Sequence, residues 1–353
     1  MKEGLNSARA KLLKMSWPNE TLRLVGKIQE FKGKQDLFKQ QLPEILEALR
    51  DAAVIQSTES SNRLEGIVIN TNRLSSIVQK KVQPQNRSES EVAGYRDVLA
   101  TVHASAEYMN LLPGLILQMD RDLMQYVGTT GGRFKNNDNT ITESYPDGTK
   151  RIRFVTVPAW QTPSAMDELV IAYRRDRELG SINELILIAA FTLDFLCIHP
   201  FSDGNGRMAR LLTLLLLYQT GYEVGRYVSL EKVIEETEEQ YYETLEQSSV
   251  GWHEGEHNLL PWVNYFLVVL LKSYQRFEER VGQTSDLKRQ RGWKAKKVQV
   301  VISHMMADFN VNDIQERCPG ISRPTIQRML NELGQENLIE CISRGRNARW
   351  KKR

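Results

Sequence analysis

Residues 199–210, with the sequence HPFSDGNGRMAR, combine a base, a carboxylate, two glycines and two guanidinium groups. Three of these residues open a predicted helix, where free backbone N–H groups and the positive end of the helix dipole bind anions: Gly204, Asn205 and Gly206. Arg207 and Arg210 lie three residues apart, so we expect both to project from one face of that helix, above the anion site. Two guanidinium groups beside such a nest suit a polyphosphate better than a single phosphate.

Two further side chains flank this predicted anion site. The imidazole of His199, with an ordinary pKa of about 6.5, suits a general base near neutral pH. The carboxylate of Asp203 can hold Mg²⁺ together with phosphate oxygens. The set predicts transfer of a phosphorus centre from a Mg²⁺-nucleotide to a hydroxyl group, with His199 taking the proton. Taken singly, the pieces are more often structural, because a Gly-Asn-Gly loop is usually a turn and a lone histidine usually packs.

Two apolar segments are expected to position this loop. Residues 181–198 are apolar nearly all round, which indicates a buried helix that runs directly into His199. A second helix is expected to begin near Gly206. The longest apolar runs, 185–193 and 211–218, are much shorter than the roughly 18 residues that a membrane span needs. The N-terminus is polar and has no apolar signal core, so we expect a cytoplasmic protein with no membrane partner.

The stretch from His199 to Arg210 matches every fixed position of the motif H-P-F-x-(D/E)-G-N-G-R-x-x-R and thereby resembles the Fic family. The resemblance implies a helical fold that transfers AMP from ATP to Ser, Thr or Tyr hydroxyls of a protein target or of itself, releasing pyrophosphate. It implies His199 as the base, Asp203 as the Mg²⁺ ligand and residues 204–206 as the nest for the α- and β-phosphates. Arg207 and Arg210 resemble the ligands of the β- and γ-phosphates.

An upstream segment, STESSNRLEGIVI, resembles the inhibitory motif (S/T)-x-x-x-E-(G/N) of the same family through Ser61, Glu65 and Gly66. We expect Glu65 to pair with Arg210 and to occupy the place of the γ-phosphate. ATP would then bind with its α-phosphate poorly aligned for attack. The alternative is a solvated glutamate near a helix end, pairing with Arg63 or with nothing.

A β-hairpin is predicted from the strands ITES and RIRFVTV, which are separated by a Pro-Asp-Gly turn. Its end resembles the Fic flap, which pairs main chain to main chain with an extended target segment. The candidate target-binding residues are Val155, Thr156, Val157 and Pro158. The alternative is an ordinary surface hairpin.

Further on, EQYYETLEQSS resembles the segment that covers the adenine, with Tyr241 or Tyr242 lining the pocket. Ser249 stands where the family often has asparagine.

The C-terminal part of the chain is basic, whereas the rest is acidic. Residues 281–353 hold 15 Lys and Arg against 7 Asp and Glu, and the other 280 residues hold 32 against 37. The tail reads as helix, turn, helix and hairpin, which resembles a winged helix-turn-helix domain that binds duplex DNA. The nucleic-acid candidates are Arg323, Gln327, Arg328, Arg344, Arg346 and Arg349. The alternative is a protein-docking module, because winged helices serve both purposes.

We therefore expect a mainly α fold in three parts. Residues 1–110 form an N-terminal helical region with the inhibitory motif, residues 111–280 a Fic domain with a β-hairpin flap, and residues 290–353 a small winged helix domain. A homodimer is left open. The first alternative function is a DNA-binding regulator with a nucleotide-sensing Fic domain. The second is removal of AMP from proteins, with Glu65 orienting a water.

The sequence also predicts the limits of one loop, one helix and one linker, and it contains one further motif. Residues 84–90 are read as a loop, LEKVIEETEEQYYETLEQ as one helix, and residues 283–297 as a linker. The letters HEGEH (residues 253–257) fit the H-E-x-x-H pattern of zinc proteases, which requires both histidines on one face of a helix. The glycine in its centre and the polar surroundings favour a solvated loop instead.

Overall fold

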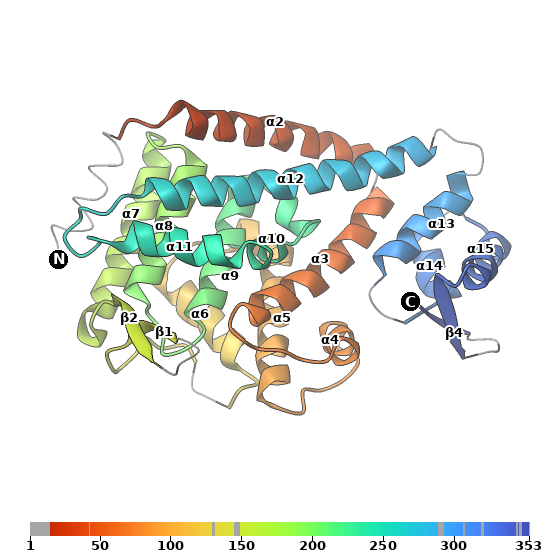
Figure 1. Cartoon of the computed structure of the whole chain (residues 1–353), viewed down its shortest axis with the longest axis horizontal. Helices are drawn as coiled ribbons and strands as arrows, with labels where there is room; N and C mark the ends of the chain where they lie inside the picture. The colour runs from red at the N-terminus through yellow and green to blue at the C-terminus, as the bar shows by residue number, and fades with distance from the viewer. Residues whose placement is uncertain are drawn as a thin grey trace.

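A computed structural model of the chain describes residues 15–41, 43–128, 131–144, 149–288, 293–305, 308–318, 321–343, 345 and 348–352. Helices dominate this part of the chain, and the strands form only two small antiparallel sheets (Figure 1). The prediction of a mainly α fold is therefore confirmed. Among the described residues, no helix combines the length and the apolar character that crossing a membrane would require.

The body of the molecule begins with a run of helices on the N-terminal side of the hairpin: α2 (Asn19–Gln41), α3 (Pro43–Arg63), α4 (Thr71–Val78), α5 (Arg87–Ser105), η1 (Ala106–Tyr108) and α6 (Pro113–Met124). It continues after the hairpin with η2 (Ala159–Gln161), α7 (Thr162–Leu179), α8 (Glu184–Ile198), α9 (Asn205–Gln219), η3 (Val224–Arg226), α10 (Leu230–Glu235), α11 (Glu238–Ser249) and α12 (Leu260–Lys288).

One hydrophobic core joins most of these helices, with α8 at its centre, whereas the buried residues of α4 belong to a smaller cluster with neighbours on α3 and α5. Every residue from Leu185 to Ile198 is buried, as the apolar sequence of this segment predicts. The same core extends from Val25 on α2 to Val281 on α12, and these two helices lie side by side across one face of the body (Figure 1). The N-terminal helices are thus packed into the body rather than attached to its surface.

The hairpin consists of β1 (Thr140–Ser144) and β2 (Lys150–Val155), which pair in antiparallel register with Thr140 opposite Val155. Both strands were predicted. The second strand ends two residues earlier than expected, because Thr156 and Val157 turn into the body and are buried.

The C-terminal part has a core of its own, which runs from Val298 to Ile339. It is built from α13 (Trp293–His304), β3 (Phe309–Asn310), α14 (Val311–Arg317), α15 (Arg323–Gln335), β4 (Ile339–Ser343) and β5 (Arg349–Lys352), with strand order β3-β5-β4. The expected succession of helix, turn, helix and hairpin is present. Its identification as a winged helix-turn-helix domain stays a prediction.

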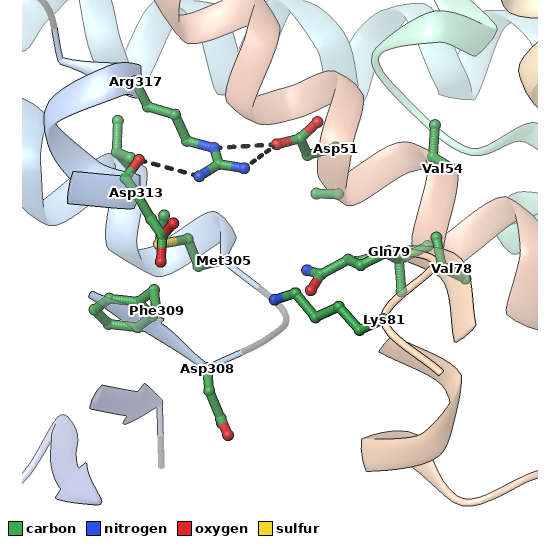
Figure 2. Close-up of a pocket in the computed structure, with 13 residues that line it drawn as sticks. Asp51, Val54, Val78, Gln79, Lys81, Met305, Asp308, Phe309, Asp313 and Arg317 are labelled. Atoms are coloured by element: carbon green, nitrogen blue, oxygen red, sulfur yellow. Dashed lines mark hydrogen bonds and ion pairs between the residues drawn. The ribbon is translucent and has the colours of Figure 1, made fainter. Parts of the chain in front are cut away.

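This C-terminal part docks beside α3 (Figure 1). Arg317 on α14 donates to Asp51 on α3 through Nε at 3.0 Å and Nη2 at 2.6 Å, and Lys351 on β5 donates to the side chain of Asn72 on α4 at 3.2 Å. A cleft of about 420 Å³ separates the two parts. Lys81 and Gln79 line it from the segment after α4, and Figure 2 shows the Arg317–Asp51 pair bridging it.

The three boundaries drawn from the sequence were wrong in detail. The side chain of Asn86 accepts from the N–H of Glu89 and caps α5, so that helix begins at Arg87 inside the expected loop. The expected single helix after Ser229 is broken between α10 and α11. The expected linker is shorter, because α12 continues to Lys288 and α13 begins at Trp293.

The close approach of α5 to α6 gives a stability prediction. A Cβ atom on Gly94 would overlap the carbonyl oxygen of Leu123 on α6. We therefore expect Gly94→Ala to lower the free energy of unfolding by about 1–3 kcal/mol, because the two helices must move apart. Gly26→Ala on α2, where an added Cβ meets nothing within 4 Å, is the matched control and should raise it by about 0.4–1 kcal/mol. Urea unfolding decides, and equal stabilities of the two variants would contradict this packing.

Candidate active site

A cavity of about 300 Å³ lies where the C-terminal end of α8 meets the N-terminal end of α9. The hairpin, α11 and the segment after α3 close its other sides. Seven of the residues singled out from the sequence line it: Glu65, His199, Gly206, Arg210, Tyr241, Tyr242 and Ser249. Sequence reasoning missed the remainder of the wall, which is mostly apolar: Ile141, Thr142, Arg153, Phe154, Leu193, Leu196, Cys197, Leu245 and Glu246.

His199 ends α8 in a left-handed conformation, with φ 53° and ψ 61°. Its Nδ1 lies 3.2 Å from the carbonyl oxygen of Leu196. Because a carbonyl can only accept, Nδ1 carries the proton in the neutral ring and Nε2 keeps its lone pair. Burial lowers the pKa of His199 to about 4, and the nearby charge of Lys135 acts in the same direction. The imidazole is therefore neutral at pH 7 and can accept a proton at Nε2.

The loop between the two helices is closed by its own side chains. The amide of Asn205 accepts from the N–H of Phe201 at 2.9 Å and donates to its carbonyl at 2.7 Å. The ring of Phe201 is buried against Phe134 and Phe195 and packs the loop onto the core. The side chain of Asn205 thus shapes the loop, and only its backbone N–H is left for an anion.

The backbone at the start of α9 remains open to a ligand. Gly204 adopts φ 79°, a conformation that would be strained for a residue with a Cβ, and a Cβ there would also lie 2.7 Å from the Met124 side chain on α6. The first hydrogen bond of the helix joins Met208 N to Gly204 O at 2.9 Å. The N–H of Gly204 donates to Asp203 Oδ1 at 2.6 Å, whereas the three N–H groups between Gly204 and Met208 have no partner within the helix. These three have the geometry of an anion nest.

Arg210 is held by the C-terminal end of α3 and the residues after it. Its Nε donates to Ser61 Oγ at 2.8 Å, and its Nη2 donates to Ser61 O at 2.8 Å and to Glu65 Oε1 at 2.7 Å. A Cβ on Gly206 would overlap the same carboxylate, so Glu65 lies against the first turn of α9. The expected Glu65–Arg210 contact is confirmed, and the carboxylate takes the position that an anion would prefer. Gly66 follows with φ 75° and turns the chain.

Helix α10 and a tyrosine fix this part of the chain in place. Ser57 Oγ donates to the buried Glu231 at 2.7 Å, and Ser60 Oγ donates to Glu235 at 2.6 Å. Tyr242 OH donates to the carbonyl of Leu64, next to Glu65, at 3.0 Å. The two glutamates were missed in the sequence. The buried serines of α3 were the available signal, because buried hydroxyls need partners.

Arg207 departs from the expected geometry. It is almost fully buried, it does not line the cavity, and its Nη1 lies 2.9 Å from Glu91 on α5. The carboxylate of Asp203 lies 3.6 Å from Nη2 of Arg207 and accepts from Arg87 at 3.2 Å. Arg210 therefore lines the cavity, whereas the guanidinium of Arg207 lies beside Gly204 and Asp203 outside it. The role of Arg207 as a phosphate ligand stays a prediction.

Asp203 is the candidate metal ligand, and its side chain is about half exposed beside the nest. Within the residues that the structure describes, no group of three or more His, Cys, Asp or Glu side chains gathers to hold a metal ion. A single carboxylate beside a phosphate site is the arrangement that suits Mg²⁺, which retains waters and shares phosphate oxygens.

The predicted flap residues divide into two classes. Val155 is exposed, whereas Thr156 and Val157 are buried and Pro158 is partly buried. His253 stacks on Phe154 with ring centroids 5.2 Å apart, and its Nε2 lies 2.7 Å from the carbonyl of Val155. The segment HEGEH is a turn, so the helix that its zinc-protease pattern requires is not formed there.

The nucleic-acid candidates lie on the C-terminal part, away from the cavity. Arg323, Gln327 and Arg328 are exposed on α15 and Arg349 is exposed on β5. Arg344 and Arg346 lie outside the described residues.

A buried carboxyl behind the nest gives a pH prediction. Asp120 on α6 accepts from Gly132 N at 2.7 Å, and burial raises its pKa to about 6. The folded state then holds this proton more tightly than the unfolded state, so its stability falls as the pH rises from about 4 to 6.

Asp120→Asn keeps an acceptor for Gly132 but cannot ionise. We expect it to be more stable than the unsubstituted protein by up to about 3 kcal/mol at pH 7.5, with an advantage that shrinks towards pH 4.5. Urea unfolding at both pH values measures this difference, with Asp122→Asn on the same helix as control. An advantage that does not change with pH would contradict the assignment.

Comparison with known proteins places this geometry in a family. A family model described as the Fic/DOC family matches residues 110–217. Protein adenylyltransferase fic-1 of Caenorhabditis elegans is 29% identical over 117 residues, which are 33% of this chain and 21% of that protein. The ribonucleoside-diphosphate reductase small chain of Ostreid herpesvirus 1 (isolate France) is 30% identical over 150 residues, or 38% of this chain and 24% of that protein. The alignments thus span between a fifth and a quarter of each curated relative.

A solved structure extends the likeness in fold to nearly the whole chain. The crystal structure of a Fic family protein from Desulfovibrio desulfuricans G20 matches with a TM-score of 0.61 at 21% identity, covering 96% of this chain and 97% of that one. The family model and the nematode relative thus show a Fic domain in residues 110–217 of this chain, and the solved structure shows that the fold is shared over nearly the whole chain.

Proposed function

We propose that the chain is a protein adenylyltransferase, which transfers AMP from ATP to a hydroxyl side chain of a protein target or of itself and is restrained by Glu65. The observation that carries this proposal is the position of the Glu65 carboxylate, which lies between the guanidinium of Arg210 and the first turn of α9. A site that binds a carboxylate with a buried arginine and a helix N-terminus also suits a phosphate.

The reaction needs a base, an in-line target and charge stabilisation. The target hydroxyl oxygen attacks the α-phosphorus, its proton passes to Nε2 of His199, and the bond from the α-phosphorus to the pyrophosphate oxygen breaks. Pyrophosphate leaves with the bonding electron pair. The open N–H groups of α9 and the guanidinium of Arg210 offset the negative charge. The neutral imidazole with its proton on Nδ1 is in the state that this step requires.

The remaining wall of the cavity suits a nucleoside. Tyr241, which is buried, and Tyr242, which is partly buried, both line the cavity. Leu196 and Leu245 supply apolar surface. The volume of about 300 Å³ lies at the lower end of the range for small-molecule sites. Ser249 at the rim replaces the amide that is frequent in relatives.

Asp203 is the residue that would hold Mg²⁺ with the phosphates. Its carboxylate is exposed enough to exchange the Arg87 contact for a cation, so the donor set fits. The ion would neutralise charge on the phosphate oxygens.

Restraint by Glu65 follows from exclusion of the γ-phosphate. The carboxylate occupies the site beside Arg210, and like charges repel, so a triphosphate can bind only with its last phosphate displaced. Such a shift moves the α-phosphorus away from the line of attack, and a displacement of about 1 Å can lower the rate about 100-fold.

Incorporation of label from α-labelled ATP with Mg²⁺ tests the proposal. Glu65→Gly should raise self-labelling about 10- to 100-fold, because a charge-assisted hydrogen bond contributes about 1.5–3 kcal/mol. Adding His199→Ala should lower it about 100-fold or more. Glu59→Ala, which removes another carboxylate of α3 that pairs with Arg63, is the matched control and should change little.

Each other outcome points elsewhere. ATP binding without labelling in any variant would contradict AMP transfer and favour a nucleotide sensor. A different result would be an activity that removes AMP from a labelled protein and disappears in Glu65→Gly. It would favour hydrolysis of the bond between AMP and the protein, with Glu65 orienting the attacking water.

We propose as a second function that the C-terminal part, residues 290–353, binds duplex DNA. The supporting observation is the two-sided character of α15. One face packs into the C-terminal core through Ile326 and Leu330, whereas Arg323, Gln327 and Arg328 are exposed on the other. An exposed basic helix after a helix and turn is the geometry that enters a major groove.

Binding of the full chain to a labelled duplex at several salt concentrations tests the second proposal. The logarithm of the association constant should fall linearly with the logarithm of the salt concentration. Arg323→Ala/Arg328→Ala should flatten that slope by about 1–2, whereas Arg175→Ala on α7, exposed on the body, should leave it unchanged. Absence of salt-dependent binding would contradict DNA binding and favour a protein partner.

A further inference from the structure

His199 has a backbone conformation that must be maintained by its surroundings. It is one of three non-glycine residues with positive φ among those described, and such a conformation is unfavourable for a residue with a Cβ. The carbonyl groups on both sides of it, at Ile198, Pro200 and Phe201, therefore need fixed partners if the imidazole is to keep one position.

Lys135, in the loop before the hairpin, supplies two of these partners. Its backbone N–H donates to Pro200 O at 2.8 Å. Its buried ammonium donates to Ile198 O at 3.2 Å. The same ammonium donates to Thr156 Oγ1 at 2.8 Å and to Asn139 Oδ1 at 2.7 Å. All three of its protons are thereby used, and one end of the hairpin is joined to the last residue of α8.

Asn139, immediately before β1, supplies the third partner. Its Nδ2 donates to Phe201 O at 3.2 Å, and its backbone carbonyl accepts from Thr156 Oγ1 at 2.8 Å. Phe134, next to Lys135, packs on the ring of Phe201. The segment 134–139 thus contacts the chain on both sides of His199 and also the residue that follows β2.

We propose that Lys135 and Asn139 are positioning residues, which hold the base His199 in its strained conformation and couple its position to the flap hairpin. The proposal rests on the assignment of His199 as the base in the proposed function. It predicts that a target segment bound along the hairpin acts on the base through these hydrogen bonds.

The charge of Lys135 also acts on the imidazole. It lowers the pKa of His199, after the larger effect of burial, whereas the carboxylates of Glu65 and Asp203 raise it. Burial also lowers the pKa of Lys135 to about 8, and Asp138 opposes that shift. Removal of the cation should therefore raise the pKa of His199.

Two measurements on the Glu65→Gly background test the proposal. In the first, kcat and KM for ATP are compared for Lys135→Met, Lys135→Arg and Asn139→Ala. Lys135→Met and Asn139→Ala should lower kcat about 10- to 100-fold, as expected for a misplaced base, with KM within about twofold. Lys135→Arg should recover most of the loss. Asn137→Ala, an exposed neighbour in the same loop, and Arg121→Met, exposed on α6, are the controls.

The second measurement does not depend on AMP transfer. The imidazole of His199 is titrated by NMR and assigned by comparison with His199→Ala. Lys135→Met should raise its pKa and Lys135→Arg should not. An unchanged kcat or an unchanged pKa of His199 in folded Lys135→Met would overturn the proposal. If no variant transfers AMP, the titration still decides whether Lys135 acts on His199, and only the proposed function fails.

Discussion

The arrangement of the candidate active site depends on which groups neutralise the charge of the buried Arg210. A guanidinium in the interior needs an anion and hydrogen-bond acceptors, because an unpaired buried charge is strongly destabilising. Ser61 and Glu65 provide both, at 2.7–2.8 Å, and the same carboxylate also lies against the positive end of α9. One side chain therefore satisfies two features that otherwise attract a phosphate. This competition between a fixed carboxylate and a mobile triphosphate is the physical basis of the proposed restraint.

The competition works only if α3 is held firmly enough for Glu65 to reach the site. Hydrogen bonds from Ser57 and Ser60 to the glutamates of α10, and from Tyr242 to the end of the segment, provide that support. The opposite half of α3 carries Asp51, which pairs with Arg317 of the C-terminal part. The helix α3 and the residues directly after it therefore contact α9, α11 and the C-terminal part. The hairpin has a comparable position on the other side, because Lys135 and Asn139 join it to the chain around His199.

The sequence predicted those features of the site that depend on neighbouring residues. The loop from His199 to Arg210 is such a feature, because spacing alone places a base, a nest and an arginine together at a helix start. The roles of Lys135, Glu91 and Glu235 were not predicted. Each of these side chains contacts a residue that is distant in the sequence, so the contact forms only when the chain has folded. The position of Arg207 could not be predicted for the same reason. Helical periodicity places it on a face of α9 but does not show that Glu91 of α5 lies opposite. The missed helix start at Arg87 reflects capping by the side chain of Asn86. The break between α10 and α11 has no such cap, because the hydroxyl of Thr237 donates back to the carbonyl of Val233 on α10.

The most direct test of the central claim is the structure of the Glu65→Gly protein with Mg²⁺ and an ATP analogue that cannot be cleaved. The account predicts that the γ-phosphate pairs with Arg210 where the Glu65 carboxylate now lies, and that the α-phosphorus faces Nε2 of His199 across room for a hydroxyl group. A triphosphate bound away from α9, with Arg210 still held only by Ser61, would contradict it.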